Sequence, residues 1–405
     1  MIKNRLFIIL TSVVLFSLCG MPAMAGQPLT RVYDGAKLAA VKAKKDTPLY
    51  EQAVKKLITE ADKSLAATPP SVMQKKMVAV SGDKHDYISM GPYWWPDPSK
   101  PDGLPYIRKD GLRNPELDKL DRNRLGDMAK HVTTLGLAYY FSGEEKYARK
   151  AADFLNTWFL NPKTRMNPNL NYGQTIPGHN NGMGRGTGLI DTYSFVGMLD
   201  AVELLNGSKA MNTKLQTGLK DWFTEFTTWM QESKIGLEEK EAKNNHGLAY
   251  DVQLAAFALY IQNTEVADAV IKAFPEERLF RQIEPDGKQP LELERTTAFG
   301  YTIFNLWHMI DMSYIAKTRS MDIYNSNDGG RSITSAIGFI LPYMGKSQSE
   351  WPWQQIKDWD KQQEEACWLL RRASFFDSQA GYEALAAKYR KTPQSSRYYL
   401  LYNLE

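Results

Sequence analysis

Cysteine is nearly absent from this sequence of 405 residues, which contains only Cys19 and Cys367. The first 25 residues have a basic start, an apolar run and small residues at Ala23 and Ala25. This pattern predicts a secretory signal peptide that is cleaved near Ala25. Cleavage would leave Cys367 alone and exclude an internal disulfide, so the exported chain must depend on its hydrophobic core. We therefore expect a periplasmic or secreted protein.

Other absences exclude several classes of protein. No second apolar stretch is long enough to span a membrane, so we expect no membrane span after the signal peptide. The 50 Lys and Arg residues nearly balance the 46 Asp and Glu residues, and no basic run favours a nucleic-acid partner. Only five His residues are present, without a HExxH motif or a dense His/Cys cluster, so we expect no metal and no other cofactor.

The chain is rich in segments with helical periodicity. The stretch 125–160 places apolar residues at helical spacing on both sides of a break at Ser142-Gly143. A last helical pair is predicted near the C-terminus, and further pairs are predicted at 187–233, 246–274 and 298–345. The predicted fold class is therefore all-α. Helical hairpins in series, without an exact repeat period, either stack as an open solenoid or close into an α/α toroid.

Two long polar loops, 85–116 and 167–188, separate these hairpins and are rich in Gly, Pro, Asn and aromatic residues. Loops of this length are usually functional or disordered, and their aromatic content argues against disorder. The second loop contains "GHNNGMGRGTG", which lacks the preceding strand and the Lys-Ser/Thr of a phosphate cradle. We expect this loop to be flexible and to close over a sugar chain. No linker divides the chain, so we expect a single domain, 26–405, that acts as a monomer.

The segment "EAKNNHGLAYDVQLAAFALY", residues 241–260, places two amides and an imidazole directly before an apolar helix. Asn244 or Asn245 could cap that helix, because an Asn side-chain oxygen accepts an orphan backbone N–H. His246 would then be a first-turn residue without a function. The alternative is that these three side chains form part of a site.

A second segment, "PDGKQPLELERTTAFGYTIFNLWHMIDM" at 285–312, surrounds another helix start. Thr296 or Thr297 could cap this helix, with Arg295 and Tyr301 near its first turns. Arg295 could be a structural ion-pair partner and Tyr301 a half-buried ring, or both could be functional. His308, further along the same apolar helix, is expected to be a core residue whose hydrogen bonds are satisfied.

Three short segments together resemble the alginate lyase superfamily, in particular polysaccharide lyase families 5 and 38. They are the Asn-His pair at 245–246, the stretch "PLELER" with the Tyr that follows it, and the loop "GPYWWPDP" at 91–98. The resemblance implies an α/α toroid, an incomplete barrel of helical hairpins with long active-site loops. It also implies a lyase that cleaves alginate, a polymer of mannuronate and guluronate. Arg295 and Tyr301 are six positions apart here, where family 5 has seven.

On that resemblance, the candidate catalytic residues are those suited to β-elimination. The reaction removes the C5 proton of a uronate, which lies α to the carboxylate, and then breaks the C4–O bond. Asn245 and Arg295 would neutralise the carboxylate as charge develops on it. Tyr301 would act as acid and base, helped by Arg295, because the pKa of a free Tyr is about 10. A neutral His246 would be the second base when the C5 proton and the C4 oxygen lie on opposite faces.

The remaining candidates would bind the acidic polysaccharide. Tyr93, Trp94 and Trp95 could stack on uronate rings or anchor a packed loop. Arg122 could meet a substrate carboxylate or be a solvated charge at a helix start. The full set of predicted substrate-binding residues is Asn244, Tyr93, Trp94, Trp95, Arg122, His179, Arg185 and Glu292.

Three other functions remain open at this stage. One is a lyase acting on β-glucuronan or another polyglucuronate. Another is an inverting glycoside hydrolase on the same toroid, which would need two carboxylates across a cleft. Glu292 and Glu294 are expected on one strand-like turn, pointing opposite ways, which makes them a poor pair for that role. The last is a helical-repeat binding protein, which the lack of a repeat period disfavours.

Overall fold

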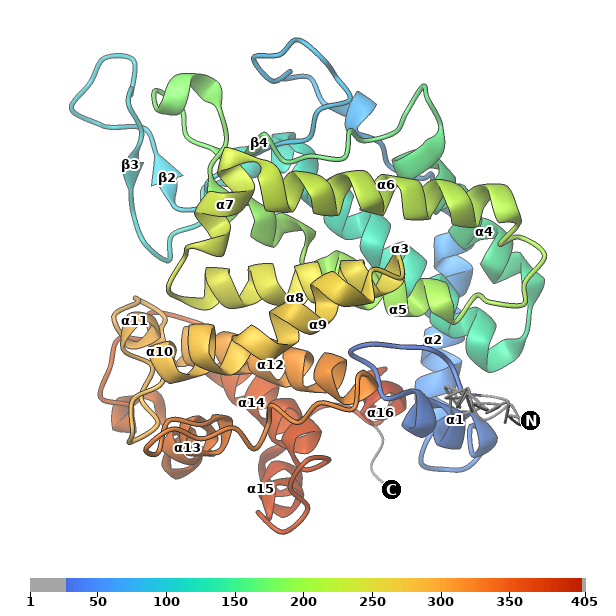
Figure 1. Cartoon of the computed structure of the whole chain (residues 1–405), viewed down its shortest axis with the longest axis vertical. Coiled ribbons are helices and arrows are strands. Elements are labelled where there is room, and N and C mark those ends of the chain that lie inside the picture. Colours follow the sequence, from blue (N-terminus) through green and yellow to red (C-terminus); the bar gives the residue numbers. More distant parts are fainter. Residues whose placement is uncertain (1–26, 403–405) are drawn as a thin grey trace, which may run out of the picture.

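Amphipathic helices make up most of the chain, and the computed structural model describes them within residues 27–402 (Figure 1). The predicted signal peptide lies outside the described residues. No helix in the described part of the chain combines the length and the apolar character needed to cross a membrane.

The observed helices follow the predicted hairpins. The long ones are α2 (Glu51–Ala66), α3 (Asp121–Ser142), α6 (Thr213–Glu232), α8 (Asn245–Tyr260), α12 (Ala298–Thr318) and α14 (Trp359–Ala373). The shorter ones are α1 (Gly35–Ala43), α4 (Glu145–Leu155), α5 (Ser194–Glu203), α7 (Lys234–Lys240), α9 (Thr264–Phe274), α10 (Phe280–Gln282), α11 (Pro290–Leu293), α13 (Ile333–Ile340), α15 (Tyr382–Tyr389) and α16 (Tyr398–Leu401). The predicted break after Ser142 is confirmed, because Gly143 ends α3 with a φ of 76°.

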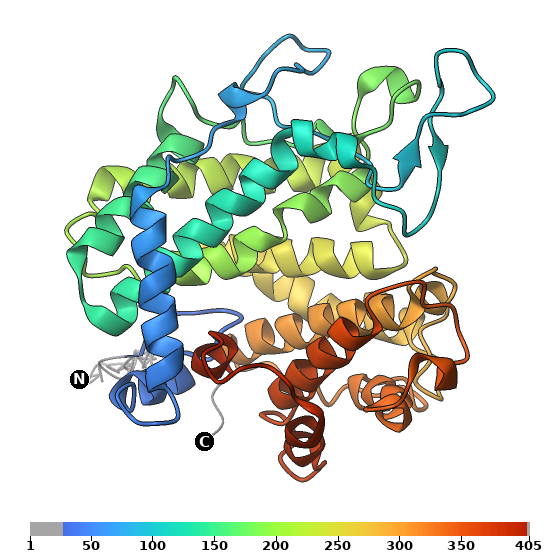
Figure 2. The ribbon, with the colours of Figure 1, turned by 180° about the vertical axis from the view of Figure 1, so that it is seen from behind.

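The helices close into a ring. Successive contacts run from α2 to α3, α3 to α5, α5 to α8, α8 to α12, α12 to α14 and α14 to α15. The last helix, α16, then packs against α1 and α2 (Figures 1 and 2). A hydrogen bond of 3.2 Å from Arg372 Nη2 to the Val32 carbonyl also joins the two ends of the chain. The predicted α/α toroid is therefore confirmed, and the open solenoid is excluded.

The core explains why α8 and α12 are apolar around most of their circumference. Both helices lie inside the ring, and a helix that is apolar on every side is a buried helix. Their polar side chains are mostly paired: Gln253 accepts a hydrogen bond from Thr192, and Asn305 donates to Gln289 and Gln282. Helical packing thus satisfies most of the polar groups that this interior contains.

His308 departs from the expectation of a satisfied core histidine. Its side chain in α12 is fully buried against Tyr193 and Phe304. Neither ring nitrogen has a hydrogen-bond partner among the described residues. Burial lowers the pKa of His308 to about 3, so the imidazole is neutral at ordinary pH.

Short strands hold the two long loops together. In one sheet β1 (Ile88–Met90) pairs in parallel with β4 (Tyr172–Thr175), so the loops at 85–116 and 167–188 share a sheet. In the other, β2 (Trp94–Trp95) pairs with β3 (Ile107–Arg108) in an antiparallel hairpin. The segment 167–188 was expected to be a flexible loop, but β4 and two short 3₁₀ helices anchor it to the body of the protein.

Candidate active site

The predicted site segments meet at one end of the ring. The starts of α8 and α12, the end of α7, the short helix α11 and the β2–β3 hairpin all lie at this end (Figures 1 and 2). The ring brings the two helix starts together because α8 and α12 pack against each other. The β2–β3 hairpin then covers them from the long loop.

Arg295 and Tyr301 form a direct pair at the start of α12. Arg295 Nη2 donates a hydrogen bond of 2.7 Å to the Tyr301 hydroxyl oxygen. The guanidinium carbon lies 3.7 Å from the centre of the Tyr301 ring, so the cation also lies against the aromatic face. The structure thus joins the two side chains whose spacing differs from the family 5 pattern.

Asp110, which the sequence did not indicate, fixes the orientation of Arg295. Its carboxylate accepts hydrogen bonds of 2.8 and 3.2 Å from Nη2 and Nε of Arg295. Burial raises the pKa of Asp110, but the hydrogen bonds and charge of Arg295 outweigh burial and hold this pKa well below its ordinary value. Asp110 also accepts from the Thr296 hydroxyl. Thr297 occupies the N-cap position of α12, one of the two expected positions, but its side chain makes no capping hydrogen bond.

Tyr93 completes the environment of the Tyr301 hydroxyl. The two hydroxyl oxygens lie 2.9 Å apart. Burial raises the pKa of Tyr301 well above its ordinary value, while the positive charge of Arg295 lowers it. If Tyr301 is deprotonated, its oxygen can accept from both Arg295 and Tyr93, and both bonds then favour the phenolate.

The start of α8 uses its three polar residues in different ways. Asn244 is the N-cap, and its side-chain oxygen accepts the His246 backbone N–H at 3.3 Å. His246 Nδ1 lies 2.7 Å from Oε1 of Glu239, in the last turn of α7. Because a carboxylate accepts but does not donate, this contact places a proton on Nδ1, so in the neutral imidazole Nε2 is the nitrogen with the free lone pair. The His246 side chain is 17% exposed, which leaves it accessible from solvent.

Asn245 and Glu292 pair with each other rather than with solvent. Glu292 accepts the Asn245 backbone N–H at 2.8 Å and its side-chain N–H at 2.7 Å. Asn245 is 0% exposed and Glu292 1% exposed. Burial raises the pKa of Glu292, while the Asn245 bonds and the charges of Arg295 and His246 lower it.

This burial corrects the expectation that Glu292 binds substrate, because its carboxylate instead ties α11 to the start of α8. The contact between Asn245 and a substrate carboxylate stays a prediction, since Glu292 takes one of the two N–H groups of that amide. Glu292 and Glu294 lie in and directly after a short helix, not on the expected strand-like turn.

Arg122 lies near Tyr93 and Tyr301 and forms an ion pair with the buried carboxylate of Asp191. Its Nε is 3.3 Å from Asp191, whose charge raises the pKa of Arg122. Asp191 also accepts hydrogen bonds from Tyr87 at 2.9 Å and Ser89 at 2.5 Å. Arg122 is therefore a fixed guanidinium rather than a solvated charge at a helix start.

Trp94, His179 and Arg185 form a cluster between the two loops. The Trp94 ring lies 5.3 Å from the His179 ring and 5.8 Å from the Arg185 guanidinium carbon. His179 Nε2 is 2.9 Å from the Tyr106 carbonyl oxygen, and Arg185 donates to the Gln174 side chain at 2.9 Å. These contacts hold the three side chains in place at the loop interface.

Trp95 and the glycine-rich stretch have structural roles. Trp95 Nε1 donates to the Leu112 carbonyl at 2.8 Å, as the packed-loop alternative predicts. A Cβ on Gly188 would lie 2.5 Å from the carbonyl carbon of Gly173, so glycine is needed where these two backbones touch. The glycines therefore permit close packing of the second loop.

A cavity of about 400 Å³ opens beside Tyr301. Its walls come from α12 and from the segment that enters α14, and Tyr93 and Tyr301 are the predicted site residues among those that line it. Other lining residues include Gly300, Phe304, Trp307, Lys357, Lys361 and Gln362. Within residues 27–402, no three His, Cys, Asp or Glu side chains gather as metal ligands would.

Several residues of this end of the ring escaped the sequence analysis, namely Asp110, Asp191 and Glu239. Each is an ordinary acidic residue, and the arginine partners of Asp110 and Asp191 lie far away in the sequence. Glu239 alone had a local signal, because it lies in the last turn of the helix that precedes the "NNH" turn, seven residues before His246.

A family model for alginate lyases matches residues 71–351. The chain belongs to the alginate lyase family. A crystal structure of an alginate lyase from Bacteroides ovatus is 68% identical, with a TM-score of 0.93 over 93% of this chain and 100% of that chain.

A more distant structure shows the same fold. Alginate lyase A1-III from Sphingomonas species A1 has a TM-score of 0.55 and 13% identity over 86% of this chain and 95% of its own. A complex of A1-III with a tetrasaccharide gives the same TM-score at 12% identity, over 86% and 94% of the two chains. A comparison with curated proteins finds no match.

Proposed function

We propose that this protein is a polysaccharide lyase that cleaves alginate by β-elimination and leaves 4,5-unsaturated uronate ends. The observation that carries this proposal is the hydrogen bond of 2.7 Å from Arg295 to the Tyr301 hydroxyl beside an open cavity. A half-buried tyrosine hydroxyl held by a guanidinium can exchange a proton with a substrate that the same cation attracts. We further propose that the protein acts in the periplasm or outside the cell.

The chemistry requires positive charge near the uronate carboxylate. Removing the C5 proton places a second negative charge on the carboxylate, and this dianion needs fixed donors around it. Arg295 and Arg122 supply two guanidiniums, and the carboxylates of Asp110 and Asp191 hold them in position. Asn244 caps α8, and the Asn245 amide next to it keeps one N–H that Glu292 does not take.

Proton transfer follows from the stereochemistry of the substrate. In mannuronate the C5 proton and the C4 oxygen lie on the same face, so Tyr301 can take the proton and return it to the leaving oxygen. In guluronate they lie on opposite faces, and Nε2 of His246 is suited to take the C5 proton. Glu239 supports this role because it holds the proton of the ring on Nδ1.

The loop cluster is suited to bind the rest of the chain. Trp94 presents an aromatic face, and Arg185 supplies charge close to it. Tyr93 is hydrogen-bonded to Tyr301, so it forms part of the cavity wall next to the glycosidic bond that is cleaved. His179 supports the Trp94 ring, and its Nε2 is held by the Tyr106 carbonyl.

Ultraviolet absorbance of the unsaturated product tests the proposal. Polymannuronate, polyguluronate and β-glucuronan would each be incubated with the protein in the presence of a chelator. An increase in absorbance with polymannuronate or polyguluronate supports the proposal. An increase with β-glucuronan alone would mean that the mechanism is β-elimination but the substrate is a polyglucuronate. No rise on any polymer, with the protein folded, contradicts the proposal.

The glycoside hydrolase gains no support from the acidic residues. Glu292 is buried and bonded twice to Asn245, so it cannot form a pair of carboxylates across a cleft with Glu294. Release of reducing ends without ultraviolet absorbance would be the result that favours a hydrolase.

A further inference from the structure

The turn between α7 and α8 connects two residues that must meet. Glu239 lies before this turn and His246 lies after it, and their side chains are 2.7 Å apart. The position of both residues therefore depends on the path of residues 240–244. If the turn moved by about 1 Å, the distance between the carboxylate and the imidazole would exceed that of a hydrogen bond.

Two side chains from one neighbouring segment donate hydrogen bonds to every second backbone carbonyl of this turn, those of residues 240, 242 and 244. The segment is the π-helical turn Pro275–Leu279 and the short helix α10 that follows it. Arg278 donates from Nη2 to the Lys240 carbonyl at 2.7 Å and from Nη1 to the Ala242 carbonyl at 3.1 Å. Gln282 Nε2 donates to the Asn244 carbonyl at 3.3 Å.

Arg278 cannot easily leave this position. Its Nε and Nη2 donate to the two carboxylate oxygens of Asp251 at 2.7 and 3.1 Å, and the residue is only 8% exposed. Asp251 belongs to α8, the helix that carries His246. One planar guanidinium thus joins the end of α7, the turn and α8, using the fork of donors that a lysine lacks.

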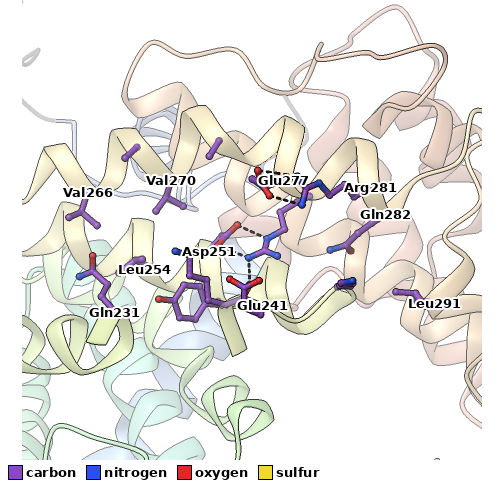
Figure 3. Close-up of a pocket in the computed structure, with 16 residues that line it drawn as sticks. Gln231, Glu241, Asp251, Leu254, Val266, Val270, Glu277, Arg281, Gln282 and Leu291 are labelled. Atoms are coloured by element: carbon purple, nitrogen blue, oxygen red, sulfur yellow. Dashed lines mark hydrogen bonds and ion pairs between the residues drawn. The ribbon is translucent and has the colours of Figure 1, made fainter. Parts of the chain in front are cut away.

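The turn also lies tightly against α8. A Cβ on Gly247 would approach the Ala242 carbonyl oxygen to 2.1 Å and Arg278 Nη1 to 2.7 Å. Glycine at 247 therefore allows the turn and the guanidinium to reach the first turn of α8. Asp251 and Gln282 lie on the wall of an adjacent cavity of about 820 Å³ (Figure 3).

We propose that Arg278 is a positioning residue for the lyase reaction. Through the carbonyls of the turn, it holds Glu239 against His246 and so keeps the proton of the ring on Nδ1 and Nε2 free as the base. This inference rests on the proposed function, in which His246 removes a proton from polyguluronate. Arg278 itself does not touch the substrate.

Arg278→Lys and a double variant, Arg278→Met with Asp251→Leu, test the proposal. The lysine keeps a charge beside Asp251 but cannot reach both carbonyls and the carboxylate. The double variant removes both charges, so that no buried carboxylate is left unpaired. For both we expect kcat on polyguluronate to fall roughly a hundredfold with little change in KM, because displacement of a catalytic group by about 1 Å can cost that much.

Arg281→Ala is the matched control. Arg281 lines the same cavity and pairs with Glu277 at 2.8 Å, but its side chain is 65% exposed. We expect this variant to keep the wild-type kcat. Circular dichroism and thermal unfolding show which variants are folded. If one of the two Arg278 variants does not fold, the other is compared with the wild type.

Nuclear magnetic resonance of protein labelled with ¹⁵N-histidine separates positioning from a merely structural effect. In the wild type we expect His246 to be the Nδ1–H tautomer, and in the folded Arg278 variants a mixture of tautomers. Wild-type kcat in a folded variant overturns the proposal, as does a loss of kcat with an unchanged His246 spectrum. If the wild type cleaves no polyuronate, the proposed function fails, and the spectrum alone decides whether Arg278 positions His246.

Discussion

The hydroxyl oxygens of Tyr93 and Tyr301 lie 2.9 Å apart, although 208 positions separate the two residues in the sequence. One belongs to the long loop that carries β2, and the other to the first turns of α12. The contact joins the loop to the ring at the hydroxyl that the proposed mechanism uses. A phenolate on Tyr301 would be stabilised by hydrogen bonds from both Tyr93 and Arg295.

The first prediction separates the two tyrosines. Tyr301→Phe should lower kcat by about 10² to 10⁴-fold, because a general acid and base is lost. Tyr93→Phe should lower kcat by about tenfold or more, because one hydrogen bond to a charged group is lost. Product absorbance on polymannuronate measures both. Equal and small effects would show that Tyr301 does not transfer the proton.

The second prediction concerns pH. Because burial raises the pKa of Tyr301, the phenolate fraction is small at neutral pH, so kcat/KM should increase as pH rises into the alkaline range. Arg295 lowers that pKa, so Arg295→Gln should move the rising limb to higher pH. Arg108→Gln is the control, since Arg108 also pairs with Asp110 but its side chain is 54% exposed. An unchanged limb in Arg295→Gln would contradict the assignment.

The third prediction tests whether Glu239 and His246 act together. His246→Ala should reduce kcat on polyguluronate by about 10² to 10⁴-fold, and Glu239→Gln should also reduce it. The double variant should be no slower than His246→Ala, because Glu239 acts only through the imidazole. On polymannuronate both substitutions should have little effect. Additive losses would indicate that Glu239 has a separate role.

The fourth prediction uses the buried pair of Asn245 and Glu292. Glu292→Gln replaces an oxygen that accepts an N–H with a group that donates, so one buried donor is left unsatisfied. We expect the free energy of unfolding to fall by about 1–3 kcal/mol. Chemical denaturation measures the change. Glu294→Gln, the exposed neighbour, should leave stability unchanged.

The fifth prediction concerns acid stability. The pKa of His308 falls from its ordinary value of 6.5 to about 3 on folding, so the unfolded chain binds this proton at a higher pH than the folded protein does. His308 therefore contributes stability that is present above pH 6.5 and is lost as pH falls towards 3. The loss is at most about 1.4 kcal/mol per pH unit.

His308→Phe removes this proton-binding group and keeps an aromatic ring against Tyr193 and Phe304. We expect the dependence of stability on pH between 6.5 and 3 to become shallower by that amount. Denaturation at several pH values measures it. An unchanged slope would show that His308 does not remain neutral in the folded protein.

Sequence periodicity predicted most of the helices because apolar residues recur at helical spacing, along one face of most of them and all round α8 and α12. The boundary at Gly143 could also be predicted, since a helix that ends in a left-handed residue favours glycine. Closure of the ring could not be predicted from periodicity, because it depends on contacts between α16 and the first two helices. The resemblance to the alginate lyase superfamily supplied that conclusion.

For the site, the sequence indicated the side chains with distinctive chemistry but not the acidic residues that orient them. Asp110 and Arg295 form their hydrogen bond although 185 positions separate them in the sequence, and no local pattern near either residue indicates this contact. Burial could not be predicted either, because Asn245 and Glu292 look like exposed polar residues in the sequence, yet both are buried and hydrogen-bonded to each other. Tertiary packing decides which polar groups face solvent.

Closure of the ring has a consequence for protein engineering. Because α16 packs on α1 and α2, the two ends of the described chain are neighbours. The terminal helices α1 and α16 both lie away from the β2–β3 hairpin (Figure 1). A short peptide could join these ends, and new termini could be opened in the turn between α5 and α6 near Gly207. Such a circular permutant would keep every contact of the candidate site while changing the order in which its helices leave the ribosome.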